Sequence, residues 1–174
     1  MALKSTVFKA QLQLADLDRN HFGDYTLTLA QHPSETNERL MVRLLAFALY
    51  ASEDLRFGNG LSSVEDAALW EIDPAGVIRL WIEVGLPDEA RLRKASGRAE
   101  RLVLIVYGSR AGLWWKQNAD ALQRYRNLTV IQLGSDDGEQ LARLAERNMK
   151  LAWTIQEGTV YLDGAEIRPQ RLLG

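Results

Sequence analysis

Cysteine is absent from the 174-residue sequence, and histidine occurs only twice, at His21 and His32. The absence of cysteine excludes disulfides, zinc fingers, thiol nucleophiles and iron–sulfur clusters, and two histidines are too few for a histidine-rich metal site. Any metal ion would therefore be bound mainly by oxygen ligands.

Long apolar runs are also missing. No run reaches the roughly 20 residues of a membrane-spanning helix, and the opening MALKSTVFKAQLQL lacks the apolar core of a signal peptide. We therefore expect a cytoplasmic protein with no membrane partner.

Neither sign of charge dominates, because 21 Lys and Arg against 23 Asp and Glu give a formal net charge of -2. A nucleic acid partner would need a local basic face.

The remaining composition, 47% hydrophobic and 25% charged, is typical of a globular domain. Apolar and polar residues alternate over 7–14 and 25–30, which predicts an antiparallel strand pair. The continuous apolar runs at 102–107 and 128–133 are typical of buried strands in a parallel sheet with helical crossovers. We predict one α/β (α+β) domain over residues 1–174, with a mixed central sheet flanked by helices. We expect the opening and closing strands to extend that sheet.

The segment 66–94, DAALWEIDPAGVIRLWIEVGLPDEARLRK, carries the clearest chemical signal. Asp73-Pro74-Ala75-Gly76 predicts a type I turn between two strands. If Asp73 faces Gly76, Trp70 opposes Arg79 and Asp66 opposes Glu83. In this register Asp73 lies roughly 20 Å from Glu83, which excludes it as a partner.

Two opposed carboxylates are unfavourable unless a cation neutralises them. A divalent metal ion is one candidate, and with a lysine from the following helix it would give the components of a metal-dependent phosphodiesterase. A positively charged side chain is the other candidate, supplied by Arg39, Arg43 or Lys94. Alternatively, Glu83 makes an ordinary salt bridge beside Trp81 on a partly solvated face.

Three further features could contact a ligand or be purely structural. Basic residues recur every three or four positions from residue 91, which predicts a stripe that meets phosphates or is simply solvated (Arg91, Lys94, Arg98 and Arg101). Ser109 and Arg110 lie where a buried strand turns into a helix, so they form a phosphate-binding site or a helix cap. Trp114 and Trp115 cannot both face inward, so one would stack on a base, cover the sheet edge or contact a partner.

Several long strings resemble the bacterial YaeQ family in their order and spacing. They are MALKSTVFKA at 1–10, HPSETNER at 32–39, LWIEVGLPD at 80–88, RKA at 93–95, and SRA at 109–111 with Trp114-Trp115. The resemblance covers nearly the whole chain. This family is regarded as a divergent relative of the PD-(D/E)xK nucleases, which implies a restriction-endonuclease-like core and a site for Mg²⁺.

By position, the resemblance implies three metal ligands: Glu38 from a helix, Asp66 from the hairpin, and Glu83 as the acid of the ExK element. Gly85 stands where that element has its lysine, so Lys94 is the candidate for a migrated catalytic lysine. The implied function is divalent-metal-dependent phosphodiester hydrolysis on nucleic acid or another phosphate-bearing ligand. The alternative is a non-catalytic binding or interaction module that retains the nuclease-like fold.

Overall fold

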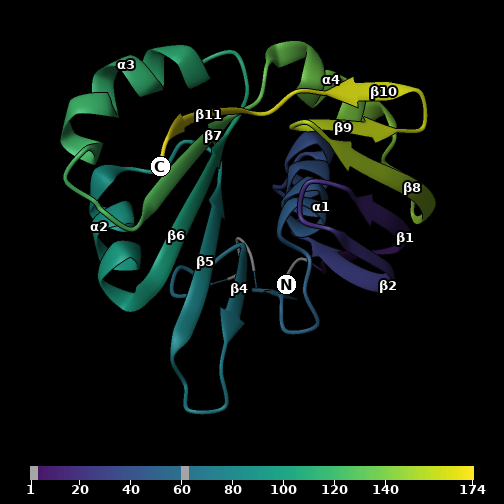
Figure 1. The fold of residues 1–174 in the computed structure, drawn as a ribbon, viewed down its shortest axis with the longest axis horizontal. Coiled ribbons are helices and arrows are strands. Elements are labelled where there is room, and N and C mark those ends of the chain that lie inside the picture. Colours follow the sequence, from purple (N-terminus) through teal and green to yellow (C-terminus); the bar gives the residue numbers. More distant parts are fainter. Residues whose placement is uncertain (1–3, 60–62) are drawn as a thin grey trace.

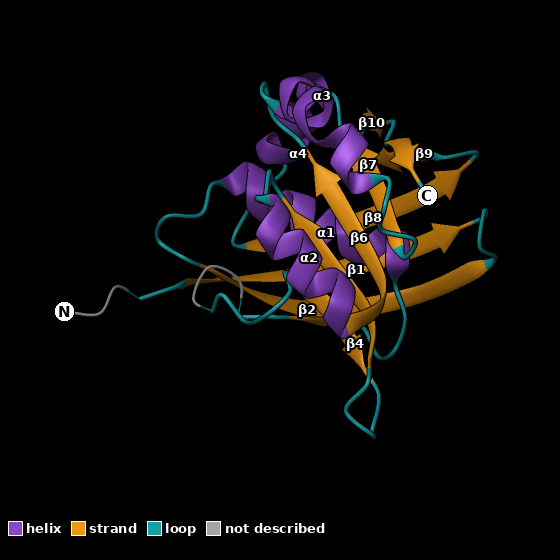
Figure 2. Cartoon of the chain, turned by 90° about the vertical axis from the view of Figure 1, so that its left-hand side faces the viewer, coloured by secondary structure: helices purple, strands orange, loops and turns teal. Residues whose placement is uncertain are grey.

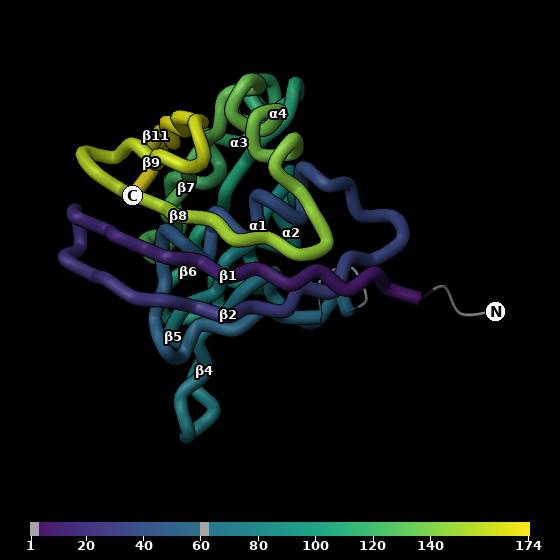
Figure 3. Tube along the Cα trace, turned by 90° about the vertical axis from the view of Figure 1, so that its right-hand side faces the viewer, coloured from purple at the N-terminus to yellow at the C-terminus, as the bar shows by residue number. Residues whose placement is uncertain are grey.

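The computed structural model describes residues 4–59 and 63–174, and its strands form two mixed sheets (Figure 1). The first sheet has the order β10-β9-β8-β1-β2. Its strands are β1 (Thr6–Asp16), β2 (His21–Gln31), β8 (Asn148–Gln156), β9 (Thr159–Leu162) and β10 (Ala165–Ile167). The predicted antiparallel pair is confirmed as β1 and β2. Figure 3 shows β8 running beside β1 on this sheet, and the two strands are parallel.

The second sheet has the order β11-β7-β6-β5-β4-β3. Its strands are β3 (Arg56–Phe57), β4 (Leu69–Ile72), β5 (Ile78–Val84), β6 (Ala99–Val106), β7 (Leu128–Gln132) and β11 (Gln170–Leu173). Strands β5, β6 and β7 are parallel, as the buried apolar runs predict. They are connected through α2 (Glu89–Arg98) and α3 (Ala111–Leu122), which cover one face of this sheet (Figure 2).

The predicted α+β class is confirmed, but the strands do not form one central sheet. Only β11 extends the second sheet, whereas β8, β9 and β10 join the opening strands in the first. The reason is the helix α1 (Asn37–Tyr50), which lies between the sheets in Figure 1 and packs on both. A helix that separates two sheets prevents their strands from pairing.

Helix α1 is apolar on all sides. Every residue from Leu40 to Ala48 is buried, including Arg43. This pattern is expected of a helix surrounded by protein rather than one packed on a single surface. The core around it combines side chains of the first sheet, such as Leu12, with side chains of the second, such as Ile82. A separate apolar cluster fills the space between the second sheet and helices α2 and α3.

Helix α4 (Ser135–Arg143) packs beside α1 and contacts β10. Within the described ranges, 4–59 and 63–174, no helix is both long enough and apolar enough to cross a membrane.

The register of the β4–β5 hairpin differs from the prediction by two residues. Gly76 donates to the Asp73 carbonyl, the Asp73 N–H donates to Val77, and Gly76 has a φ of 85°. A turn closed by a left-handed glycine adds one residue to the loop, and a second irregularity lies between Glu71 and Ile72. Trp70 therefore opposes Trp81, not Arg79. Asp66 precedes β4, so the predicted pairing of Asp66 with Glu83 is wrong.

Gly58 offers a test of the chain path before this hairpin. Its N–H donates to the Ala68 carbonyl at 3.0 Å, and a Cβ at this position would overlap the Ala67 carbonyl oxygen. Gly58→Ala should therefore lower the free energy of unfolding by about 1–3 kcal/mol, as measured by chemical denaturation. Gly97→Ala is the matched control, since a Cβ there meets no atom within 4 Å. The control should raise stability by about 0.5 kcal/mol, and equal effects of the two substitutions would contradict the structure.

Candidate functional site

A cavity of about 340 Å³ lies at the carboxyl end of β5, and two of the predicted site residues line it. They are Asp66, in the loop before β4, and Glu83, near the end of β5. Two arginines also line it: Arg39 from α1 and Arg91 from α2. Asp66 and Glu83 thus line one cavity, although they are not paired across the hairpin.

The carboxylate of Glu83 is held by a tryptophan and an arginine. Oε1 accepts from Trp81 Nε1 at 2.6 Å and from an Arg91 terminal nitrogen at 2.9 Å, and Oε2 accepts from Arg91 Nε at 2.9 Å. Glu83 is 5% exposed, so its charge is compensated by these donors rather than by water. Hydrogen bonding to Glu83 in turn raises the pKa of Arg91.

Arg91 also connects Glu83 to the loop that carries Asp66. Its terminal nitrogens donate to the main-chain carbonyls of Val64 at 2.7 Å and Asp66 at 2.9 Å. The carboxylate of Asp66 has a different donor, because it accepts from the main-chain and side-chain nitrogens of Asn59 at 3.0 and 2.7 Å. The two acids are thus bonded to separate donors, and no oxygen of Glu83 is left without a partner.

Glu38 lies in the first turn of α1 and packs against α4, where a Cβ at Gly138 would collide with its carboxylate. Burial, and secondarily the neighbouring Glu139, raise the pKa of Glu38. The face of β5 toward α1 carries Ile82, whose side chain belongs to the core around that helix. Glu83, the next residue, points to the opposite face, toward α2. Glu38 thus lies against α4, whereas the carboxylate of Glu83 is bound by Arg91 of α2.

Lys94 lies on the exposed side of α2. Its Nζ contacts both carboxylate oxygens of Glu65, at 2.7 and 2.9 Å, and both side chains are more than half exposed. The structure thus pairs Lys94 with Glu65 and leaves Arg91 as the cation at Glu83.

Glu38, Asp66, Glu83 and Lys94 are not brought together at one point. In the part of the chain that the structure describes, no group of three or more His, Asp or Glu side chains could hold a metal ion. The residues present therefore do not fit the Mg²⁺ site that the family resemblance implies.

The remaining predicted residues lie at the start of α3. Arg110 takes the N-cap position without a side-chain capping bond, and both Ser109 and Arg110 are exposed. The predicted helix cap by Ser109 is therefore not formed. Trp114 donates from Nε1 to the Pro87 carbonyl at 3.0 Å, and both Trp114 and Trp115 are half-buried against the outer core. Both indoles therefore contact the same apolar cluster, although neither is fully buried.

Arg91 is the important residue that sequence reasoning missed. It appeared there only as one member of a basic stripe, and the cations considered for Glu83 were Arg39, Arg43 and Lys94. The available signal was its position three residues after the helix cap Asp88. A side chain in the first turn of a helix lies near the end of the preceding strand, where Glu83 is.

The Glu83–Arg91 pair should contribute strongly to stability. Arg91→Met leaves a buried carboxylate without its counter-charge, and should lower the free energy of unfolding by about 3 kcal/mol in urea denaturation. Lys94→Met is the matched control on the same helix. Because its partner Glu65 is exposed, we expect no measurable change in the free energy of unfolding. The double substitution Arg91→Met with Glu83→Gln should recover part of the loss. Equal small effects of the two single substitutions would show that Glu83 does not depend on Arg91.

Glu38 should make stability depend on pH. Its raised pKa means that the folded state binds the proton more tightly than the unfolded chain. The resulting stabilisation is present below the ordinary pKa and is lost as pH rises through the raised value. Glu38→Gln removes this loss, so the melting temperature of the variant minus that of wild type should be more positive at about pH 7 than at about pH 4. A difference independent of pH would contradict the raised pKa.

Comparison with known proteins identifies the family. The family model described as YaeQ protein matches residues 1–169. YaeQ of Salmonella typhi is 48% identical over 168 residues, covering 95% of this chain and 92% of that protein. YaeQ of Escherichia coli strain K12 is 48% identical over 166 residues, covering 93% and 90%.

Two crystal structures have the same fold. The YaeQ protein of Xanthomonas axonopodis pv. citri superposes with a TM-score of 0.94 at 47% identity, covering 98% of this chain and 99% of that one. The YaeQ protein of Pseudomonas syringae superposes with a TM-score of 0.93 at 41% identity, covering 98% and 97%. Sequence and fold match over nearly the full length of this chain and of each of these relatives. The chain therefore belongs to the YaeQ protein family.

Proposed function

We propose that this protein is a non-catalytic binding module that keeps the order of elements of a PD-(D/E)xK nuclease. The order α1, β3, β4, β5, α2, β6 supports the nuclease-like part of the proposal. Along the chain, an acid from a helix, Glu38, comes first, and Asp66 and Glu83 from the hairpin region follow. This is the order that the family resemblance implies. On this proposal, the former metal position is an ion-pair cluster.

The main support for the proposal is the ion pair between Glu83 and Arg91. A divalent cation needs carboxylate lone pairs directed at one point, and both oxygens of Glu83 already accept from Arg91 or Trp81. A guanidinium group stays protonated at all physiological pH values, so Arg91 cannot act as a general base. Lys94, the other candidate for activating water, is bound to Glu65.

Metal-dependent phosphodiester hydrolysis through Glu38, Asp66, Glu83 and Lys94 is the competing proposal. Its supporting observation is that Asp66 and Glu83 line one cavity. It would require Arg91 to leave Glu83, and the cost of exposing that buried charge makes this the weaker proposal. A nucleic acid substrate also receives little support from the overall charge of -2. The cytoplasmic location stays a prediction.

Calorimetric titration with Mg²⁺ and Mn²⁺ tests the proposal directly. We expect no binding that depends on Glu83, so wild type and Glu83→Gln should give the same signal, as should the surface control Glu65→Gln. Hydrolysis of bis(p-nitrophenyl) phosphate in the presence of either ion should stay at the background rate for all three proteins. Metal binding abolished by Glu83→Gln but not by Glu65→Gln, together with hydrolysis, would establish the nuclease alternative instead.

A further inference from the structure

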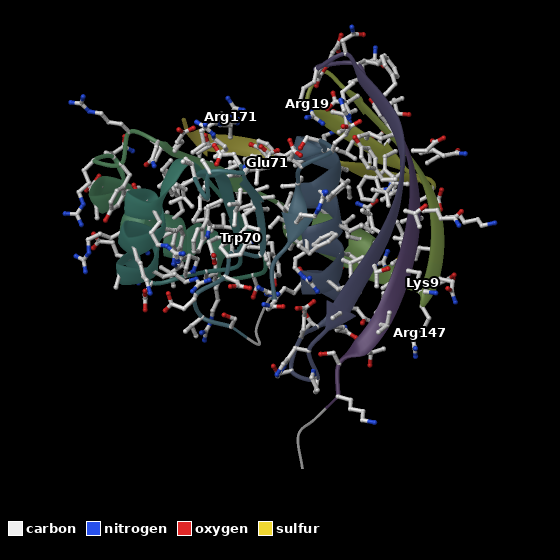
Figure 4. The ribbon with its side chains drawn as sticks, turned by 90° about the horizontal axis from the view of Figure 1, so that it is seen from below. Lys9, Arg19, Trp70, Glu71, Arg147 and Arg171 are labelled. Carbon is white, nitrogen blue, oxygen red and sulfur yellow. The ribbon has the colours of Figure 1, made fainter. Side chains whose placement is uncertain are left out.

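A second and larger cavity, of about 520 Å³, opens between the two sheets at the last turn of α1. We call it the inter-sheet cleft. The β1–β2 turn contributes Arg19, and the second sheet contributes Glu71 and Arg171. Figure 4 shows Arg19 on one side of the gap, with Glu71 and Arg171 on the other. The cleft lies toward the start of β5, where Leu80 is part of its wall, and away from Glu83.

The acidic side chains of the cleft already have partners. Asp16 is bound by the main-chain and side-chain nitrogens of Arg19, and Glu71 accepts from Ser52 Oγ at 2.7 Å. Asp18 accepts from the main-chain nitrogens of Glu157 and Gly158, at 2.7 and 2.9 Å. These bonds fix where the carboxylate oxygens point. The donors to Asp18 and Glu71 are neutral, so these two acids keep their negative charge.

Two arginines of the cleft have no such partner. Among the residues that the structure describes, Arg101 and Arg171 form neither an ion pair nor a side-chain hydrogen bond. Arg101 lies on β6, where it pairs with Leu80 on β5, which pairs with Glu71 on β4. Arg171 pairs with Ile131 on β7. Both arginines therefore belong to strands of the second sheet, and both side chains are exposed.

Tyr50, the last residue of α1, lies among these cations. Burial raises the pKa of its phenol, whereas the charges of Arg171, Arg101 and Arg19 lower it. Its side chain is half-buried and lines the cleft. Arg19 is fixed nearby, because it donates to the carbonyls of Ala48 and Ala51 at the end of α1. Tyr50 and three arginines thus line one cavity.

The rest of the wall is apolar. It is formed by side chains from α1, from both sheets and from the loop before β11: Leu49, Leu80, Ile131, Ile155 and Pro169. A cavity of this size holds a small organic molecule, since such pockets measure about 300–1,000 Å³. Arginines beside an apolar wall favour a ligand that has an anionic group at one end and an apolar group at the other.

We infer that the inter-sheet cleft binds a small organic phosphate monoester, with the phosphate at Arg101, Arg171 and Tyr50 and the organic group against the apolar wall. A phosphate offers three terminal oxygens and close to two negative charges, which matches several convergent donors better than a single carboxylate does. Arginine also presents its donors as a planar fork suited to phosphate. The inference rests on the proposed binding function and supplies its ligand class.

Calorimetric titration with phenyl phosphate, inorganic phosphate and benzoate tests the inference. Phenyl phosphate should bind about tenfold more tightly than inorganic phosphate, because its ring gains burial on the apolar wall. It should also bind about tenfold more tightly than benzoate, which has one negative charge and two oxygens. Arg101→Gln with Arg171→Gln should weaken phenyl phosphate binding by about tenfold or more. Tyr50→Phe, which keeps the ring and removes only the hydroxyl, should weaken it by about fivefold.

Arg143→Gln is the matched control, because Arg143 is an exposed arginine of α4 outside the cleft. It should leave the affinity unchanged. No binding of phenyl phosphate, or binding weakened equally by the control, would overturn the inference. Benzoate binding as tightly as phenyl phosphate would overturn the assignment to phosphate. Because the titration needs no divalent ion, its failure is distinct from metal-dependent hydrolysis, which would instead overturn the proposed function.

Discussion

Burial of α1 between the two sheets is the constraint on which the rest of the structure depends. The helix is enclosed from Leu40 to Ala48, and one of the enclosed side chains is Arg43. Its charge is compensated by Glu35 at 2.6 Å and by the Ala30 carbonyl at 3.1 Å. A buried charge without a partner would be costly, so this pair ties the segment between β2 and α1 to the middle of the helix.

The position of α1 also decides which chemistry is available at the carboxyl end of β5. Side chains of β5 that face the helix, such as Ile82, must be apolar, so an acid on this strand can occupy only the other face. There, Glu83 is enclosed by the second apolar cluster and needs a counter-charge of its own, which Arg91 provides. The arrangement that buries α1 therefore directs Glu83 toward α2 and makes the Glu83–Arg91 pair part of the structural framework.

The two ends of the second sheet differ in how their charges are balanced. At the carboxyl end of β5, the acid and the arginine satisfy each other, and the lysine of α2 is paired at the surface. Toward the start of β5, the acids are bonded to Arg19, Ser52 and main-chain nitrogens, and Arg101 and Arg171 form no ion pair with any described residue. The anion site that we infer therefore lies where α1 ends.

The sequence by itself determined the α+β class, the β1–β2 pair, the buried parallel strands β6 and β7, and the family. Each of these depends on local periodicity or on long matching strings. Tertiary structure decided the rest. Pairing of β8 with β1 joins segments far apart in the chain without a local signal, and the left-handed Gly76 changed a register that the turn residues alone did not reveal. The choice of Arg91 over Lys94 depended on helix placement, because two cations three residues apart are equivalent until the helix packs against the strand.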